Sequence, residues 1–187
     1  MAESHPLNSE WTMWHGDALE KDWSKKIQPI CDFSTVEEFW QYFNHIPRPG
    51  KVFFDGESKA SVGPSNKVID ELSIFKKGIK PEWEDPQNRD GGCFYIRQAL
   101  DPDQVDIYWQ NTVLALIGET LDEKDSIAGA RIVDKGKNFA LYRFELWLKT
   151  ADEEVVNKIK ERFHACIKEG SPNFKKGHPK FEWKKHK

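Results

Sequence analysis

The segment from residue 81 to 86 (PEWEDP) places an indole, Trp83, directly before a carboxylate, Glu84, in a loop flanked by prolines. The face of an indole attracts a cation through its quadrupole, by roughly 1–2 kcal/mol when the pair is desolvated. A carboxylate can accept two parallel N–H bonds from the Watson–Crick edge of guanine. The pair is therefore suited to a protonated or alkylated guanine. The alternative, which these residues leave open, is a tryptophan that only anchors a loop beside a solvated carboxylate.

Eight tryptophans are a large aromatic content for a chain of 187 residues. Most of them fit a role in the core, because tryptophan side chains are highly buried on average. A few can serve as stacking surfaces, where each stacked base contributes about 1–3 kcal/mol. Composition does not separate the two roles, so position along the chain has to decide between them.

Catalysis is a different class of function that the same loop brings up. Three carboxylates cluster there, Glu82, Glu84 and Asp85, and carboxylate pairs can serve glycoside or phosphoryl chemistry. The chain has no P-loop, no H-E-x-x-H and no G-x-S-x-G motif, and its six histidines are scattered. The sequence therefore predicts a binding protein without catalytic residues or a cofactor, and not an enzyme.

Charge and cysteine content narrow the class of binding protein. A formal charge of -3 argues against a protein that coats nucleic acid by charge alone, so any contact with RNA is expected to be local. The three cysteines (Cys31, Cys93 and Cys166) form no C-x-x-C pair, which predicts neither a disulfide framework nor a zinc site. No apolar run approaches the length of a membrane span. We expect a cytoplasmic protein, with a nuclear pool allowed.

Strands and helices alternate along the chain. Alternating or apolar segments between turn residues predict strands at residues 10–14 (within the segment 5–15), 72–75, 93–98, 127–134, 142–149 and 181–183. Helical signals mark three further segments: one N-capped by Ser34 with Glu37 completing a capping box, one from Asp101-Pro102 to about Gly118, and one from Asp152 to Gly170.

Several of these strands are joined by links too short for right-handed crossovers. That favours an α+β fold with a mostly antiparallel sheet and about three helices on one face. The chain is predicted to form a single domain, residues 1–187. Residues 47–66 are expected to be a long inserted surface loop in which Val52-Phe53-Phe54 could dock, and residues 175–187 a basic C-terminal strand and tail.

From His5 onward the chain resembles the cap-binding translation initiation factor 4E family. The matching pieces follow one another in consistent order over most of the chain: residues 5–7 (HPL), 11–14 (WTMW), 23 (W), 35–40 (TVEEFW), 44–46 (NHI), 78–85 (GIKPEWED), 91–92 (GG), 109 (W), 116–119 (LIGE) and 129–130 (GA). The resemblance implies a curved sheet with the helices on its convex face and a ligand slot on its concave side. It also implies binding of the 7-methylguanosine cap of mRNA and recruitment of that mRNA for translation initiation.

The resemblance assigns the cap-binding residues one by one. The two tryptophans that sandwich the methylated guanine correspond to Trp23 and Trp83, and the carboxylate that reads the guanine edge corresponds to Glu84. The tryptophan that touches the N7-methyl group is best matched by Trp147. Methylation makes the guanine cationic, so its attraction to the indoles and to the carboxylate should rise together.

The basic pair that binds the cap phosphates falls on Lys135 and Arg143. Three additional residues separate these two positions, so Lys137 in the same hairpin competes for the role. The alternative for all three is a solvated hairpin tip without a ligand.

The resemblance also implies that a helical peptide of a scaffold protein, initiation factor 4G-like, binds the face opposite the slot. The residues expected to contact it are His5, Pro6, Val36, Trp40 and Leu114. Val36 and Trp40 share one helix face at a spacing of i and i+4. The alternative is that both are core residues.

Two departures from the family pattern leave a second function open. Gln110-Asn111 stands where the family usually carries Leu-Glu, which puts standard scaffold binding in doubt. Cys93 stands at a position near the phosphates that is basic in the family. A cap-binding repressor that does not engage the usual scaffold is therefore the alternative reading. Such divergence is expected of one of several paralogues in a protist, such as a kinetoplastid.

Overall fold

An antiparallel sheet forms the centre of the protein, whose computed structural model describes residues 4–167, 169–170 and 181–186. The strands lie in the order β2-β1-β4-β6-β7-β5-β8, and the short β3 pairs with β4. Every one of these pairings is antiparallel, as predicted. The strands are β1 (Pro6–Asp17), β2 (Ile27–Thr35), β3 (Ser61–Val62), β4 (Lys67–Lys76), β5 (Gly92–Gln98), β6 (Ile127–Asp134), β7 (Tyr142–Leu148) and β8 (Glu182–Lys185).

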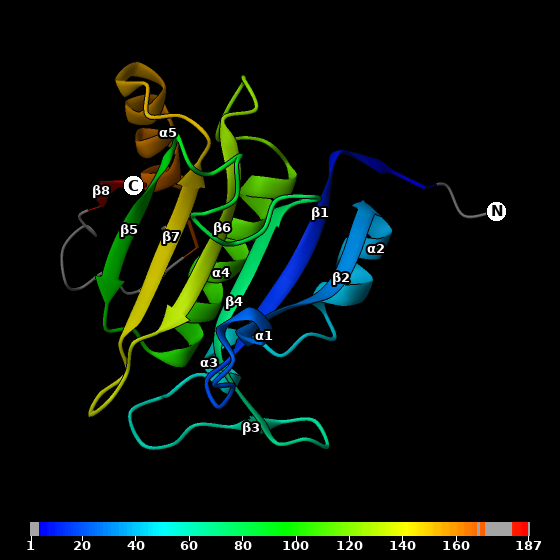
Figure 1. Ribbon diagram of the computed structural model, residues 1–187, viewed down its shortest axis with the longest axis vertical. Helices are drawn as coiled ribbons and strands as arrows, with labels where there is room; N and C mark the ends of the chain where they lie inside the picture. Colours follow the sequence, from blue (N-terminus) through cyan, green and yellow to red (C-terminus); the bar gives the residue numbers. More distant parts are fainter. Residues whose placement is uncertain (1–3, 168, 171–180, 187) are drawn as a thin grey trace.

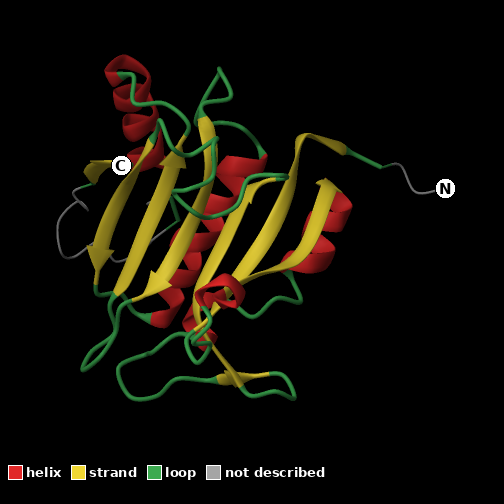
Figure 2. Ribbon diagram, viewed as in Figure 1, coloured by secondary structure: helices red, strands yellow, loops and turns green. Residues whose placement is uncertain are grey.

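The described part of the chain contains three longer helices and two helices of a single turn. They are α1 (Trp23–Lys26), α2 (Val36–Phe43), α3 (Pro49–Val52), α4 (Pro102–Ile117) and α5 (Glu153–Cys166). Figure 1 shows α2, α4 and α5 behind the curved sheet and α1 in front of it. The three longer helices are those that the sequence predicts, and the α+β class is confirmed. Seen by element type in Figure 2, the front face of the sheet carries only α1 and loops.

Side chains along each strand alternate between the helical core and the open face of the sheet. In β7, Phe144, Leu146 and Leu148 belong to the main core cluster, which the helices cover. Arg143, Glu145 and Trp147 lie on the opposite, concave face. Because successive side chains of a strand point to opposite faces, β7 contributes every second residue to the core and the residues between them to the candidate site.

The first long helix begins one residue later than predicted. Thr35, not Ser34, is the N-cap, and its hydroxyl accepts the N–H of Glu38 at 3.2 Å. The Glu38 carboxylate accepts the N–H of Ser34 at 2.8 Å. Adjacent Ser-Thr and Glu-Glu pairs offer two capping boxes of equal spacing, so sequence alone does not choose between them. Glu37 instead accepts from the backbone N–H of His5 at 3.1 Å.

Residues 47–66 are more ordered than a surface loop, because they contain α3 and β3. Val52 and Phe53 are almost fully buried, and the Phe53 ring stacks on Tyr142 with 6.2 Å between centroids. The docking expected for this apolar triplet is thus confirmed for its first two residues. The inserted segment lies at the foot of β6 and β7 (Figure 1).

Strand β2 is not predicted from the sequence, because it carries Pro29 in its interior. The strand is an edge strand, and Pro29 pairs with Trp14 next to a register shift at which β2 has one additional residue, Ile30, so a missing N–H donor is tolerated there. At the other edge, β8 runs slightly beyond the predicted strand and pairs with β5. Most of the predicted basic tail, residues 175–180 and 187, lies outside the described residues. Within the described helices, none has the length and apolar character needed to span a bilayer.

Candidate functional site

Trp23 stands on α1, in the connection between β1 and β2. Asp22 caps this short helix by accepting the backbone N–H of Ser24 at 3.1 Å and its hydroxyl at 2.7 Å. These hydrogen bonds hold the pKa of the Asp22 carboxyl below its usual value. The Trp23 side chain is 73% exposed, and Lys26 Nζ lies 5.6 Å from the centre of its ring. The indole is therefore presented to solvent on a capped helical turn.

Trp83 is 52% exposed in the loop between β4 and β5, and Glu84 beside it is also exposed. Two polar side chains, Asp85 and Asn88, hold that loop in shape. Asp85 Oδ2 accepts the N–H of Lys80 at 2.9 Å. Asn88, which is fully buried, donates its amide to the carbonyl oxygens of Lys80 at 2.9 Å and Glu82 at 2.8 Å. The loop is thus fixed from inside while its indole and carboxylate stay accessible.

Replacing Asn88 with alanine should lower the free energy of unfolding by about 1–3 kcal/mol, because two backbone carbonyls lose a buried donor. Urea denaturation followed by circular dichroism measures this. Gln87→Ala, at an exposed neighbouring position, is the matched control and should change stability by less than about 0.5 kcal/mol. An unchanged denaturation midpoint for Asn88→Ala would show that the loop does not depend on this amide.

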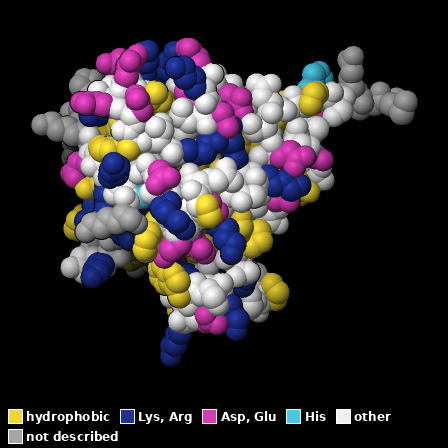
Figure 3. Space-filling view, turned by 45° about the horizontal axis from the view of Figure 1, so that its top comes forward, with side chains coloured by type: hydrophobic (Ala, Val, Ile, Leu, Met, Phe, Trp, Pro, Cys, Tyr) yellow, Lys and Arg dark blue, Asp and Glu magenta, His cyan; other side chains and the backbone are white. Residues whose placement is uncertain are grey.

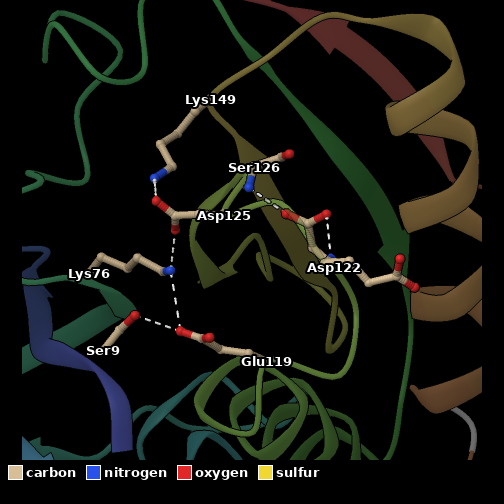
Figure 4. A network of polar contacts seen from close by, with 8 residues as sticks. Ser9, Lys76, Glu119, Asp122, Asp125, Ser126 and Lys149 are labelled. Carbon is tan, nitrogen blue, oxygen red and sulfur yellow. Dashed lines mark hydrogen bonds and ion pairs between the residues drawn. The ribbon is translucent and has the colours of Figure 1, made fainter.

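The start of the same loop is secured by a polar network at the upper end of the sheet (Figure 4). Lys76, the last residue of β4, forms ion pairs with Glu119 and Asp125. Ser9 donates to Glu119 at 2.5 Å, and Lys149 pairs with Asp125 at 2.7 Å. The network joins β1, β4, the end of α4 and the end of β7. It holds β4 at the point where the chain leaves for Trp83.

The floor of the concave face is made by three rows of side chains that cross β4, β6, β7 and β5. Strand registers give the rows as Phe75-Gly129-Trp147-Cys93, Ser73-Arg131-Glu145-Tyr95 and Glu71-Val133-Arg143-Arg97. Neighbouring members of a row are paired across adjacent strands, so their side chains stand next to one another. The first row contains no charged side chain, whereas the other two rows contain five.

Trp147 lies in the first row and is almost fully buried, with 3% of its surface exposed. Its indole N–H donates to Glu145 Oε2 at 2.8 Å, and the Phe75 ring meets it edge-on at 5.5 Å. The guanidinium of Arg131 lies 4.9 Å from the indole centre. Trp147 is therefore held in one orientation as part of the floor, unlike the exposed Trp23 and Trp83.

Cations outnumber carboxylates in the two charged rows and at the adjoining end of β6. Glu145 is buried between Arg131 and Arg143, with Arg143 Nε 2.7 Å from its Oε1. Burial opposes ionisation of Glu145, but the two guanidinium groups hold its pKa below the usual value. Partial desolvation and the charges of Arg131, Arg143 and Arg97 lower the pKa of Lys135. The predicted phosphate residues Lys135 and Arg143 thus belong to one cationic group.

Arg97 lies directly opposite Arg143 in the β5–β7 register and is exposed. Like charges opposite each other in a sheet are destabilising unless an anion lies between them. Arg97, Arg131 and Glu145 are not among the residues predicted from the sequence, because only strand pairing brings them next to Lys135 and Arg143. Lys137, the third predicted phosphate residue, is exposed farther out in the β6–β7 hairpin.

The part of the chain that the structure describes contains no group of three or more His, Cys, Asp or Glu side chains able to hold a metal ion. The buried Cys93 has its pKa raised to about 11, because desolvation and the charge of Glu145 both disfavour the thiolate. The concave face thus offers aromatic rings, one accessible carboxylate at Glu84, and an excess of cations. This combination suits a flat, positively charged ring that carries an anionic chain.

A family model described as "Eukaryotic initiation factor 4E" matches residues 6–187. The chain belongs to the eukaryotic initiation factor 4E family. A relative from Candida glabrata, named eukaryotic translation initiation factor 4E, is 34% identical over 169 residues, which cover 88% of this chain and 72% of the relative.

Solved structures of initiation factor 4E proteins share the fold of this 4E-family chain. Caenorhabditis elegans eIF4E-3, in a complex with the 4E-binding protein Mextli and a cap analog, superposes with a TM-score of 0.73 at 27% identity, covering 96% of this chain and 92% of that one. Ascaris suum eIF4E-3, in a complex with an m2,2,7G cap, gives a TM-score of 0.77 at 25% identity, covering 99% and 93%.

On the opposite side of the 4E-family sheet, His5 and Pro6, two of the residues predicted to contact a partner, lie at the start of α2. The N–H of Val36 donates to the carbonyl oxygen of His5 at 2.9 Å, and Pro6 pairs with Thr35. Trp40 is 37% exposed on α2, so it is not a fully buried core residue. Leu114 is half-buried on α4.

Gln110 and Asn111, the two departures from the 4E-family pattern, both have partners within the chain. Gln110 accepts from the guanidinium of Arg48 at 2.9 Å, and the same guanidinium lies 4.1 Å from the centre of the Phe43 ring. Asn111 donates its amide to the carbonyl oxygen of Glu169 at 2.7 Å. Both polar side chains thus connect α4 to other segments of the chain, Gln110 to Arg48 and Asn111 to Glu169.

Proposed function

We propose that this chain binds the 7-methylguanosine cap of mRNA and recruits that mRNA for translation initiation through a scaffold partner. In this proposal Trp23 and Trp83 sandwich the methylated base, Glu84 accepts N–H bonds from the guanine edge, and Trp147 contacts the N7-methyl group. The observation that carries the proposal is the pair of exposed indoles on the concave side of a 4E-family sheet, one on the helical turn α1 and one in the loop between β4 and β5 (Figure 1). The cap analog in the nematode complex supports the same ligand class.

The chemistry favours the methylated base over ordinary guanine. Methylation at N7 places a positive charge on the ring, which strengthens its attraction to two indole faces and to the Glu84 carboxylate. Stacking itself contributes about 1–3 kcal/mol per base and does not depend on methylation. Unmethylated GTP therefore keeps part of the stacking and loses the charge-dependent part.

The phosphates are proposed to lie against the cationic group formed by Lys135, Arg143 and Arg97, with Lys137 nearby. The repulsion that lowers the Lys135 pKa would be relieved by an anion at this point. Figure 3 shows Lys and Arg side chains interspersed with acidic and hydrophobic ones on the face in view, and no continuous basic surface of described residues covers that face. The affinity for a triphosphate ligand should accordingly fall as salt concentration rises.

Tryptophan fluorescence titration tests the proposal. We expect marked quenching by 7-methyl-GTP at concentrations where GTP has little effect, since exposed indoles that stack on a base change their emission. Equal responses to the two nucleotides would contradict selection of the methylated base. No catalytic step is assigned to the chain, and release of hydrolysis products from a cap analogue on incubation with the purified protein would contradict that.

Scaffold recruitment is proposed to use the surface of His5, Pro6, Val36, Trp40 and Leu114. Exposed aromatic side chains that gather with other apolar residues mark protein interaction surfaces. Mextli in the nematode complex is described as a 4E-binding protein, which supports a protein partner for this family member. The activity belongs to the cytoplasm, where translation takes place.

A second candidate function is a cap-binding repressor that does not engage the usual scaffold. Gln110 and Asn111 favour it, because both polar side chains are engaged within the chain on the side where the partner would dock. Affinity purification from cell extract separates the two functions. Recovery of a large scaffold and a helicase supports recruitment, and their absence from a cap-competent protein supports repression.

Trp40→Ala should leave the affinity for 7-methyl-GTP within about twofold while reducing recovery of a partner about tenfold or more, as expected of an exposed tryptophan at an interface. Parallel cap titrations and pull-downs measure the two effects. Tyr42→Ala, equally exposed on the same helix, is the matched control. Loss of cap binding in Trp40→Ala would contradict the separation of the two surfaces.

A further inference from the structure

Phe139 shares an unusual property with the two proposed stacking tryptophans. Among the aromatic side chains in the described residues, three are more than half exposed: Trp23 at 73%, Phe139 at 58% and Trp83 at 52%. Phe139 lies in the loop between β6 and β7, which also contains Lys135 and Lys137. An aromatic ring with lysines beside it is the composition of a surface that stacks single-stranded nucleotides.

The loop that carries Phe139 is closed at its base and supported from below. The N–H of Lys135 donates to the carbonyl oxygen of Leu141 at 2.8 Å, which closes residues 135–141. At the start of the loop, the buried Asp134 carboxylate accepts the N–H groups of Phe54 and Gly136, each at 2.8 Å. The position of the loop is therefore determined by internal contacts.

The inserted segment provides this support. Lys59 Nζ pairs with Asp134 at 2.8 Å, and the Tyr142 hydroxyl donates to the carbonyl oxygen of Phe54 at 3.2 Å. A Cβ atom at Gly136 would lie only 2.6 Å from the Phe54 ring. Residues 54–59 thus pack directly beneath the hairpin. Lys59 neutralises the charge of Asp134. The charge that remains in the loop of Phe139 is that of Lys135 and Lys137, and neither lysine forms an ion pair with another described residue.

The proposed contacts along β7 and the loop before it would follow the order of the groups in a capped RNA. Trp147 is the proposed contact of the methylated base, and Arg143 is the proposed phosphate contact four residues earlier, about 13 Å along the strand at roughly 3.3 Å per residue. Phe139 comes four residues before Arg143, beyond the hairpin closure. In a cap the triphosphate separates the methylated guanosine from the first transcribed nucleotide. That nucleotide would leave the cationic group toward the hairpin.

We propose that Phe139 and Lys137 form a second nucleotide subsite, in which the base of the first transcribed nucleotide stacks on the Phe139 ring. Lys137 neutralises the phosphate that follows this nucleotide. The subsite accepts any base, because every base has a face that can stack. It rests on the proposed cap binding and extends it from the cap to the first residue of the RNA.

The test compares two ligands that differ only in one base: 7-methylguanosine linked through a triphosphate to adenosine, and the same compound with ribose in place of adenosine. The wild type should bind the adenosine ligand about fivefold or more tightly than the ribose ligand, which is the lower range for stacking of one base. Phe139→Ala should bind both equally, and Phe139→Trp should restore the preference. Intrinsic fluorescence or calorimetry measures the affinities.

Leu19→Ala is the matched control, since Leu19 is a similarly exposed apolar residue outside the hairpin, and it should keep the wild-type preference. A wild type that binds both ligands equally, or a Phe139→Ala variant that keeps the preference, overturns the subsite while leaving cap binding intact. Failure of the wild type to bind either ligand overturns the proposed cap binding itself, and the subsite with it.

Discussion

Glu84→Ala is expected to lower the affinity for 7-methyl-GTP roughly 100-fold. The carboxylate is proposed to accept two N–H bonds from a cationic guanine, and hydrogen bonds to charged groups contribute about 1.5–3 kcal/mol each. Two such bonds at the lower figure amount to about 3 kcal/mol, which is about two orders of magnitude in affinity. Because Glu84 is exposed, its removal leaves no buried group unpaired within the chain. Fluorescence titration of variant and wild type measures the loss.

Two controls make the Glu84 result specific. Glu82→Ala removes a carboxylate from the same loop and should bind 7-methyl-GTP with nearly wild-type affinity, since the loop contact of Glu82 is made by its carbonyl oxygen. Glu84→Gln keeps the shape and one acceptor, and should fall between wild type and alanine. If Glu84→Ala and Glu82→Ala weaken binding equally, the effect is one of overall loop charge and not of recognition of the guanine edge.

Trp23→Ala and Trp83→Ala should each reduce the affinity for 7-methyl-GTP about 100-fold, while the free energy of unfolding changes by less than about 1 kcal/mol. Each ring contributes stacking of about 1–3 kcal/mol and an additional cation–π attraction to the methylated base. Both side chains are more than half exposed, so neither fills a cavity in the core. Titration with 7-methyl-GTP and urea denaturation measure the two quantities separately.

Trp147→Phe provides a contrast within the same site. Trp147 is buried and its indole N–H donates to Glu145, so the change leaves a buried carboxylate oxygen without this donor and should reduce stability as well as binding. Trp40→Ala, on the other side of the sheet, should leave the cap affinity nearly unchanged. Retention of full affinity by either Trp23→Ala or Trp83→Ala would exclude that residue from the sandwich.

The loop carrying Trp83 and Glu84 could be predicted because its chemistry is local. The indole and carboxylate are adjacent in sequence, and the flanking prolines predict a loop. The long helices could likewise be predicted from capping residues and from the spacing of their apolar positions. The N-cap of α2 was predicted one residue early, because two Ser/Thr–Glu pairs have the same spacing and only the hydrogen bonds of Thr35 distinguish them.

The edge strand β2 and the two one-turn helices were not predicted. Pro29 masks the strand signal of β2, and four-residue helices are too short for a periodic pattern. Pairing with β1 stabilises β2, the preceding Asp22 caps α1, and in α3 the N–H of Gly50 donates to the Asp106 carboxylate at 2.7 Å. Trp23 illustrates the consequence, since the sequence places it in a polar connection but does not reveal that Asp22 caps a helical turn beneath it.

By itself the sequence determined the α+β class, membership of a family, and the aromatic and acidic residues expected to recognise a methylated base. Only the tertiary structure decided the cationic floor, where Arg97, Arg131 and Glu145 join Lys135 and Arg143 through the pairing of β5, β6 and β7. It also decided that the inserted segment supports the β6–β7 hairpin through Asp134. The reason is physical: the alternation of a strand specifies which face a side chain occupies, whereas its neighbours on that face depend on strand order and register.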